Sequence, residues 1–96
     1  MKKPFLEVSL PVSIFKEGKN FVVYTPALDL STSGKNFEEA KKRFHEVVTL
    51  FIEETIKKGT LEEVLRESGW KKIEKGWLPP LLVAHGAEKI KVPALG

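Results

Sequence analysis

Residues 21–40 read FVVYTPALDLSTSGKNFEEA, and this stretch carries the pattern that decides the fold. Its first five residues are all β-branched or aromatic, which is typical of a strand, and Pro26 ends the run. A further short extended segment spans residues 29–33 and closes at Gly34. The stretch therefore predicts two short strands joined by a proline-bearing turn.

A long amphipathic helix is predicted to begin directly after these strands. Asn36 and Glu39 have the spacing of a capping box, and the acidic side chain lies where the helix dipole favours negative charge. Two lysines followed by Gly59 indicate where the helix ends. Apolar residues recur at three- and four-residue spacing and form one stripe that can cover a sheet face: Phe37, Ala40, Phe44, Val47, Val48, Phe51, Thr55 and Ile56.

The residues before this stretch predict a strand that pairs with it. Apolar and polar residues alternate over residues 6–14, which is the period-two pattern of a strand with one buried face. Pro11 lacks a backbone N–H, so we expect this strand to lie at an edge or to contain a bulge. Residues 16–20 are polar and include a glycine, which predicts a turn and an antiparallel hairpin. The three segments together predict a meander.

After the long helix the pattern becomes less regular. Thr60 and Glu63 repeat the capping spacing and predict a short second helix, which Gly69 terminates. Residues 71–77 alternate loosely between polar and apolar side chains and predict a fourth strand.

These elements predict an α+β fold with an antiparallel β-β-β-α-β core, a short second helix and an extended C-terminal tail. We place the α+β domain at residues 1–76 and the proline-containing tail at residues 77–96. In the tail, Ile90 and Val92 alternate with lysines and predict a terminal strand that Pro93 limits. Because exposed apolar surface of this kind favours docking or contact between copies, we also expect a homo-oligomer.

The composition excludes several classes of protein. The 96 residues include no cysteine, which rules out disulfide frameworks, thiolate zinc sites and cysteine nucleophiles. No apolar run reaches the roughly 20 residues of a membrane span. The N-terminal residues also lack a signal-peptide pattern, so we expect a cytoplasmic protein without membrane contact. Fourteen lysines and twelve glutamates stand against one aspartate and no glutamine, a bias typical of hyperthermophile proteins.

The residue types and spacings typical of enzymes are not found in the sequence. His45 and His85 are the only histidines, and neither has metal-ligand spacing. Ser31 and Ser33 lack a nucleophile-elbow motif, and Asp29 is the single aspartate that could orient a histidine. Most glutamates fall on the predicted helices and do not form the cluster that two-metal catalysis requires. We therefore expect no enzymatic activity, no metal site and no cofactor.

Several of these segments together resemble the HicB-like antitoxin family. The pattern covers about residues 5–58, and the matching stretches are FVVYTPAL at 21–28, STSG at 31–34, NFEEA at 36–40 and the helix through 46–54. The sequence departs from the family at Asp29 and Leu30, where a Gly-Cys pair often follows the turn. The resemblance implies a core similar to a truncated RNase H fold without its catalytic carboxylates. It also implies an antitoxin that binds and masks a small RNA-cleaving HicA-like toxin.

The C-terminal third contains the residues that we expect to contact partners. Residues 71–96 have a net charge of +3, and the candidate partner-binding residues are Lys71, Lys75, Trp77, Lys89 and Lys91. An alternative function is RNA or DNA binding, in which Trp70 and Trp77 stack on bases and the neighbouring lysines contact phosphates. The simpler interpretation is that both tryptophans pack in the core or in an interface. Many family members also carry a C-terminal DNA-binding module, but residues 71–96 are too short and too rich in proline for a helix-turn-helix.

Overall fold

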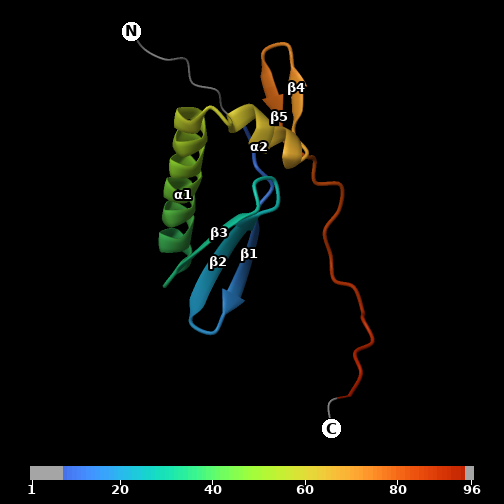
Figure 1. Ribbon diagram of the computed structural model, residues 1–96. Coiled ribbons are helices and arrows are strands. Elements are labelled where there is room, and N and C mark those ends of the chain that lie inside the picture. Colours follow the sequence, from blue (N-terminus) through green and yellow to red (C-terminus); the bar gives the residue numbers. More distant parts are fainter. Residues whose placement is uncertain (1–7, 95–96) are drawn as a thin grey trace.

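The computed structural model describes residues 8–94 and shows an α+β fold (Figure 1). Its elements are, in chain order, β1 (Ser13–Glu17), β2 (Asn20–Thr25), β3 (Leu30–Gly34), α1 (Phe37–Lys58), α2 (Leu61–Glu67), β4 (Lys71–Ile73) and β5 (Gly76–Leu78). The first three strands form an antiparallel sheet in the order β1-β2-β3, and α1 packs on this sheet. The predicted α+β class and the meander of three strands followed by a long helix are confirmed.

The first hairpin is displaced along the chain from its predicted position. The strand predicted for residues 6–14 begins only at Ser13 and continues to Glu17, and the predicted residue Leu6 lies outside the described residues. A tight turn at Gly18 joins β1 to β2, and Gly18 takes the positive φ of 59° that such a turn favours. The antiparallel hairpin itself is confirmed, with β1 at the edge of the sheet as expected.

Pro11 explains why this strand begins late. Proline has no backbone N–H to donate to a neighbouring strand. The Pro11 carbonyl accepts a hydrogen bond of 2.7 Å from the Thr25 hydroxyl. The same buried hydroxyl accepts a bond of 3.3 Å from the Ala27 N–H. Thr25 therefore holds both residues 8–12, which we call the N-terminal segment, and the turn that follows β2.

The ends of α1 follow the predicted signals. The Asn36 side chain caps the helix by accepting a hydrogen bond of 2.8 Å from the Glu39 N–H, and Gly59 ends it in the left-handed conformation. Ala40, in the first turn of α1, is fully buried where the helix faces the sheet. A Cβ atom at Gly34 would lie 2.5 Å from the Ala40 nitrogen, so β3 and α1 approach this closely only because Gly34 has no side chain.

Two predictions for the region after α1 are wrong in detail. The helix α2 forms, but the Thr60 side chain makes no capping hydrogen bond, so the capping box predicted from Thr60 and Glu63 is absent and burial of Leu65 holds the helix in place. The strand predicted for residues 71–77 is divided into β4 and β5, because the residues before Gly76 form a turn. This second hairpin is separate from the main sheet, so the predicted fourth strand does not join the core sheet.

The main core cluster lies where the turn after β2 meets α2. It joins Ala27 and Leu28 of the turn to Leu65 and Trp70, with partly buried apolar side chains packed around them. The Trp70 Nε1–H donates a buried hydrogen bond of 2.7 Å to the Ala27 carbonyl oxygen, which comes 43 residues earlier in the chain. A second cluster of Val23 with side chains of α1 joins the helix to the sheet.

Residues 79–94 form neither helix nor strand, and they extend away from the rest of the chain (Figure 1). The alternation of Ile90 and Val92, which predicts a terminal strand, does not produce one in the single chain. A strand needs a neighbouring backbone to complete its hydrogen bonds. Residues 79–94 do not pair with either sheet of their own chain.

Replacement of Trp70 by Phe should lower the free energy of unfolding by about 1–3 kcal/mol, because the Ala27 carbonyl oxygen would lose its donor while remaining buried. Urea unfolding followed by circular dichroism measures the change. Trp77→Phe is the matched control, because the Trp77 ring is half-buried and no hydrogen bond from its indole is found within residues 8–94. Equal losses in the two variants would show that this hydrogen bond does not stabilise the fold.

Asp29 takes a left-handed backbone conformation with a φ of 52°, and it is the only non-glycine residue among residues 8–94 with a positive φ. Aspartate tolerates this region better than most residues do. Its Oδ1 atom also accepts a hydrogen bond of 3.1 Å from the Tyr24 hydroxyl. The pKa of Tyr24 lies above its ordinary value mainly because of this hydrogen bond.

Asp29→Gly and Asp29→Ala both remove the bond to Tyr24, but only alanine retains a Cβ in the left-handed conformation. We expect the alanine variant to be less stable than the glycine variant by about 1 kcal/mol, as measured by thermal unfolding. Ultraviolet titration of Tyr24, the only tyrosine, should show its pKa falling towards the ordinary value in both variants. Equal stabilities of the two variants would show that the left-handed conformation at position 29 does not favour glycine over alanine.

Candidate partner-binding surfaces

The hairpin of β4 and β5 presents three of the five predicted partner-binding residues. Lys71 and Lys75 are exposed, and Trp77 is half-buried. In the register of the hairpin, Lys71 lies opposite Leu78 and Trp77 lies opposite Lys72. The structure therefore brings Lys71, Lys75 and Trp77 together in one small unit that projects beyond α2 (Figure 1).

Trp77 is in contact with two cations. The guanidinium carbon of Arg66 lies 5.4 Å from the centre of the indole ring, and the Nζ atom of Lys72 lies 5.8 Å from it. Each contact of this kind stabilises by roughly 0.5–1 kcal/mol at an exposed site. Lys72 also forms an ion pair of 2.8 Å with Glu62 on α2. These contacts fix the hairpin against α2 and leave Lys71 and Lys75 exposed.

The ion pair of Lys72 and Glu62 makes the stability of the fold depend on pH. The hydrogen bond from Lys72, together with its charge, holds the pKa of Glu62 below its ordinary value. Because folding lowers this pKa, the pair contributes stability above the ordinary pKa of a glutamate, and the contribution is lost as the pH falls through the lowered pKa. Both side chains are more than half exposed, so solvent screening keeps the contribution small.

Lys72→Met should therefore raise the pKa of Glu62 towards its ordinary value. Carboxyl-carbon NMR titration of the wild type and the variant measures this change. Lys71→Met is the control, because it removes a neighbouring lysine of β4 that makes no ion pair within residues 8–94. If the Glu62 pKa were the same in the wild type and in Lys72→Met, the pair would not exist in solution.

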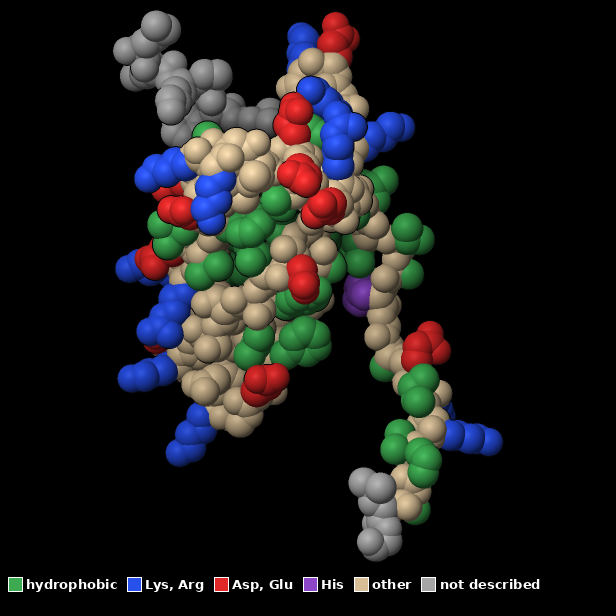
Figure 2. Space-filling view, in the orientation of Figure 1, with side chains coloured by type: hydrophobic (Ala, Val, Ile, Leu, Met, Phe, Trp, Pro, Cys, Tyr) green, Lys and Arg blue, Asp and Glu red, His purple; other side chains and the backbone are tan. Residues whose placement is uncertain are grey.

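The other two predicted partner-binding residues, Lys89 and Lys91, lie on the extended tail. The structure does not bring them near the hairpin, since the tail leads away from it towards the opposite end of the molecule (Figure 1). Figure 2 shows hydrophobic side chains along this tail, separated from the body of the fold. Their exposed fractions are large: Leu81 87%, Val83 94%, Ile90 75% and Val92 75%.

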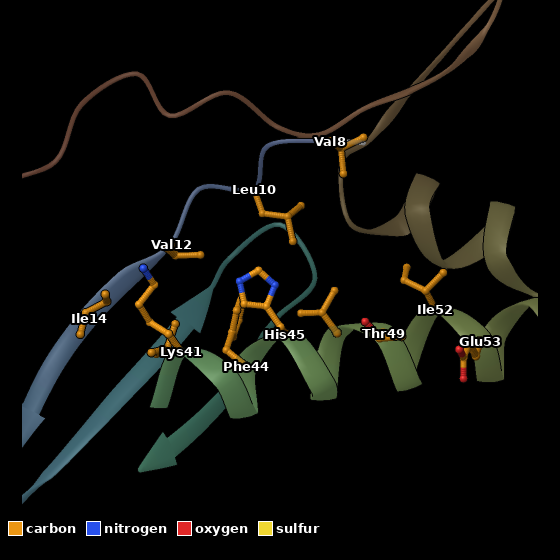
Figure 3. Close-up of a pocket in the computed structure, with 12 residues that line it drawn as sticks. Val8, Leu10, Val12, Ile14, Lys41, Phe44, His45, Thr49, Ile52 and Glu53 are labelled. Carbon is orange, nitrogen blue, oxygen red and sulfur yellow. The ribbon is translucent and has the colours of Figure 1, made fainter. Parts of the chain in front are cut away.

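An apolar groove between the N-terminal segment and α1 is a feature that our sequence reasoning missed (Figure 3). The helix packs on β2 and β3 but not on β1, so the side chains that β1 and the N-terminal segment direct towards α1 stay uncovered. Val12 is 45% exposed and Ile14 is 38% exposed. The groove has a volume of about 830 Å³, and its apolar lining consists of Val8, Leu10, Val12, Ile14, Val23, Phe44, Val48 and Ile52.

The polar residues of the groove form a single row along α1. Each follows the previous one by four residues, so neighbours in the row lie next to one another and the row winds by about 40° per step around the helix: Lys41, His45, Thr49 and Glu53. All four are exposed. The row is therefore positive at the N-terminal end of the helix and negative nearer its C-terminal end (Figure 3).

The residues considered for catalysis do not form a catalytic group. His45 lies at the rim of the groove and His85 lies in the tail. Ser31 and Ser33 are exposed on β3, and Asp29 is hydrogen-bonded to Tyr24. Within residues 8–94, no group of three His, Asp or Glu side chains is placed to hold a metal ion.

Comparisons of this chain with protein-family models, with curated proteins and with solved structures found no match. None of the helices in the described part of the chain has the length and apolar character needed to cross a bilayer. The hairpin, the tail and the groove are the candidate functional surfaces within residues 8–94.

Proposed function

We propose that this chain is a HicB-like antitoxin-type protein that binds and neutralises a small RNA-cleaving HicA-like toxin by protein–protein contact. In this proposal the chain is not itself an enzyme, acts in the cytoplasm of an organism that grows at high temperature, and has a core similar to a truncated RNase H fold. The residues that resemble the family form β2, β3 and the first part of α1, in the order that the resemblance implies.

The turn after β2 supports this proposal at the point where the sequence departs from the family. Asp29 stands where the family often has a glycine, and its φ of 52° is a value that glycine adopts without strain. The hydrogen bond from Tyr24 accompanies this conformation of the aspartate. The substitution is therefore compatible with the same turn geometry.

The exposed apolar tail is the observation that carries the protein-binding function. Single exposed apolar residues are common, but a run of them on an extended segment is typical of a surface that binds another protein. Val83 is 94% exposed and Leu81 is 87% exposed. We propose that the partner-binding surface consists of the hairpin residues Lys71, Lys75 and Trp77 and the tail residues Lys89 and Lys91.

The surroundings of Trp77 favour protein binding over nucleic-acid binding. A base stacks on an accessible aromatic face, whereas Arg66 and Lys72 already lie 5.4 Å and 5.8 Å from the centre of this ring. Lys72 is also neutralised in part by Glu62. Trp70 is buried and has its indole N–H bonded to Ala27, so it offers no stacking face.

The test begins with a pull-down of the tagged full chain from its native lysate after nuclease treatment. We expect a small basic protein in stoichiometric amount. That protein, once purified, should cleave RNA by itself and should lose the activity when an equimolar amount of this chain is added. Recovery of this chain alone, or of a partner whose RNA cleavage it does not inhibit, would refute the antitoxin function.

Variants of the hairpin then test the proposed surface. The combination of Lys71→Glu, Lys75→Glu and Trp77→Ala should weaken inhibition of the toxin by roughly tenfold or more, because aromatic and charged side chains supply much of the binding energy at interfaces. Lys42→Glu, an exposed change on α1, should leave inhibition unchanged. A triple variant that folds and inhibits as the wild type does would remove the hairpin from the interface.

A salt titration distinguishes protein binding from the alternative function, which is the binding of RNA or DNA. Binding of labelled RNA through lysines would weaken steeply between low and physiological salt, because counterions are released from the phosphates. An interface with an apolar centre would be less sensitive to salt. RNA binding with a steep salt dependence and without any protein partner would favour the nucleic-acid function.

A further inference from the structure

The groove and the tail are two apolar surfaces of the same chain that are exposed in the single copy. The groove exposes Val12 and Ile14 above the helix stripe, and the tail exposes Ile90 and Val92. We propose that residues 88–92 of a second copy bind in the groove of the first, and that the exchange is reciprocal. This proposal does not depend on the antitoxin function, because it concerns only two copies of this chain.

The spacing of side chains in the groove fits an extended segment. Helix residues four apart, such as Phe44 and Val48, are separated by about 6 Å along the helix axis. Alternate residues of an extended chain, such as Ile90 and Val92, are separated by roughly 6.5 Å. The N-terminal segment already lines one wall of the groove with residues that alternate in this way. A second extended segment can therefore place Ile90 and Val92 over successive turns of α1.

The charges of the rim match those of the tail in one direction only. Lys41 and Glu53 lie at opposite ends of the polar row of α1, and no ion pair involves either of them within residues 8–94. In the tail, Glu88 precedes Lys91. A tail that runs parallel to α1 brings Glu88 towards Lys41 and Lys91 towards Glu53, whereas the reverse direction opposes like charges.

The distances permit this pairing. From Lys41 to Glu53 the helix rises about 18 Å, and an extended chain advances roughly 10 Å from Glu88 to Lys91. The long, flexible side chains at the four positions cover the difference. In an extended chain Glu88, Ile90 and Val92 share the face that points into the groove, whereas Lys89 and Lys91 lie on the outward face, from which Lys91 can reach the exposed Glu53 at the rim.

A second copy fits the observed conformation of the tail better than the same chain does. The tail leaves the body in an extended form, apart from α1 in Figure 1, and Ile90 and Val92 each stay 75% exposed on their own chain. The tail runs in the direction opposite to α1 in Figure 1, so to lie parallel to α1 in its own groove it would have to turn back. A two-fold axis lets both tails remain extended while each covers the groove of the partner copy, and this closed arrangement is the common form of a homodimer.

Charge reversal in the full-length chain tests the contact between Lys91 and Glu53. The wild type should be a dimer, and Glu53→Lys or Lys91→Glu alone should weaken dimerisation by roughly tenfold or more, since each change places like charges at both symmetric contacts. An equimolar mixture of the two variants should form a heterodimer with near wild-type affinity, because both contacts again pair opposite charges. Sedimentation equilibrium gives the affinities, and native mass spectrometry with one variant labelled with ¹⁵N identifies the heterodimer.

Two further variants make the result decisive. Glu54→Lys mixed with Lys91→Glu is the matched control, because Glu54 is next to Glu53 but does not line the groove, and this mixture should not recover. Ile90→Asp should give a monomer whose circular dichroism matches that of the wild type, because the tail contributes no helix or strand to the single chain.

Three results would overturn the proposal. The first is a wild type that stays monomeric at all concentrations. The second is a dimer that neither single charge reversal weakens. The third is recovery in a chain that carries both Glu53→Lys and Lys91→Glu but not in the mixture of single variants, since recovery of this kind would show that the tail binds the groove of its own chain.

Discussion

The hydrogen bond from the Trp70 indole to the Ala27 carbonyl is the interaction on which the rest of this structure depends. It is buried, and it joins the turn after β2 to the residue that directly precedes the second hairpin. The same turn is tied to the N-terminal segment through the Thr25 hydroxyl and Pro11. Three parts of the chain that are far apart in sequence therefore meet at one short turn, and the loss of a donor there would leave a buried carbonyl without a partner.

The position of α1 follows from a second constraint, the close approach of Gly34 and Ala40. Because no side chain separates β3 from the helix at this point, α1 lies over β3 and β2. A helix so placed does not reach β1, which is held at the far edge of the sheet by its pairing with β2. The apolar groove is the direct result: the sheet is one strand wider than the surface that the helix covers.

Local signals in the sequence were sufficient for the elements whose causes are local. The cap formed by Asn36 and the glycine that ends α1 need only residues within one turn of the helix, and both were predicted. The late start of β1 depends on a bond from Thr25 to Pro11, which alternation within residues 6–14 cannot reveal. The groove also escaped prediction, because the sequence shows an apolar stripe and an alternating strand but not how far one lies from the other. The five predicted partner-binding residues remain predictions, divided by the structure between the hairpin and the tail.

The hairpin and the tail lie apart, which bears on how one small chain can make the two proposed contacts, one with a second copy of itself and one with a different protein. The buried apolar core of residues 8–94 comprises only seven side chains in two clusters, so burial outside the single chain is a sizeable addition to its stability. If the tail of one copy covers the groove of another, the apolar surface that would otherwise favour aggregation is used in a defined assembly. The hairpin is fixed to α2 through Lys72 and Glu62 and takes no part in that exchange, so it stays available to a different partner. Of the proposed partner-binding residues, the exchange therefore uses only Lys89 and Lys91 of the tail and leaves Lys71, Lys75 and Trp77 of the hairpin available to a different partner.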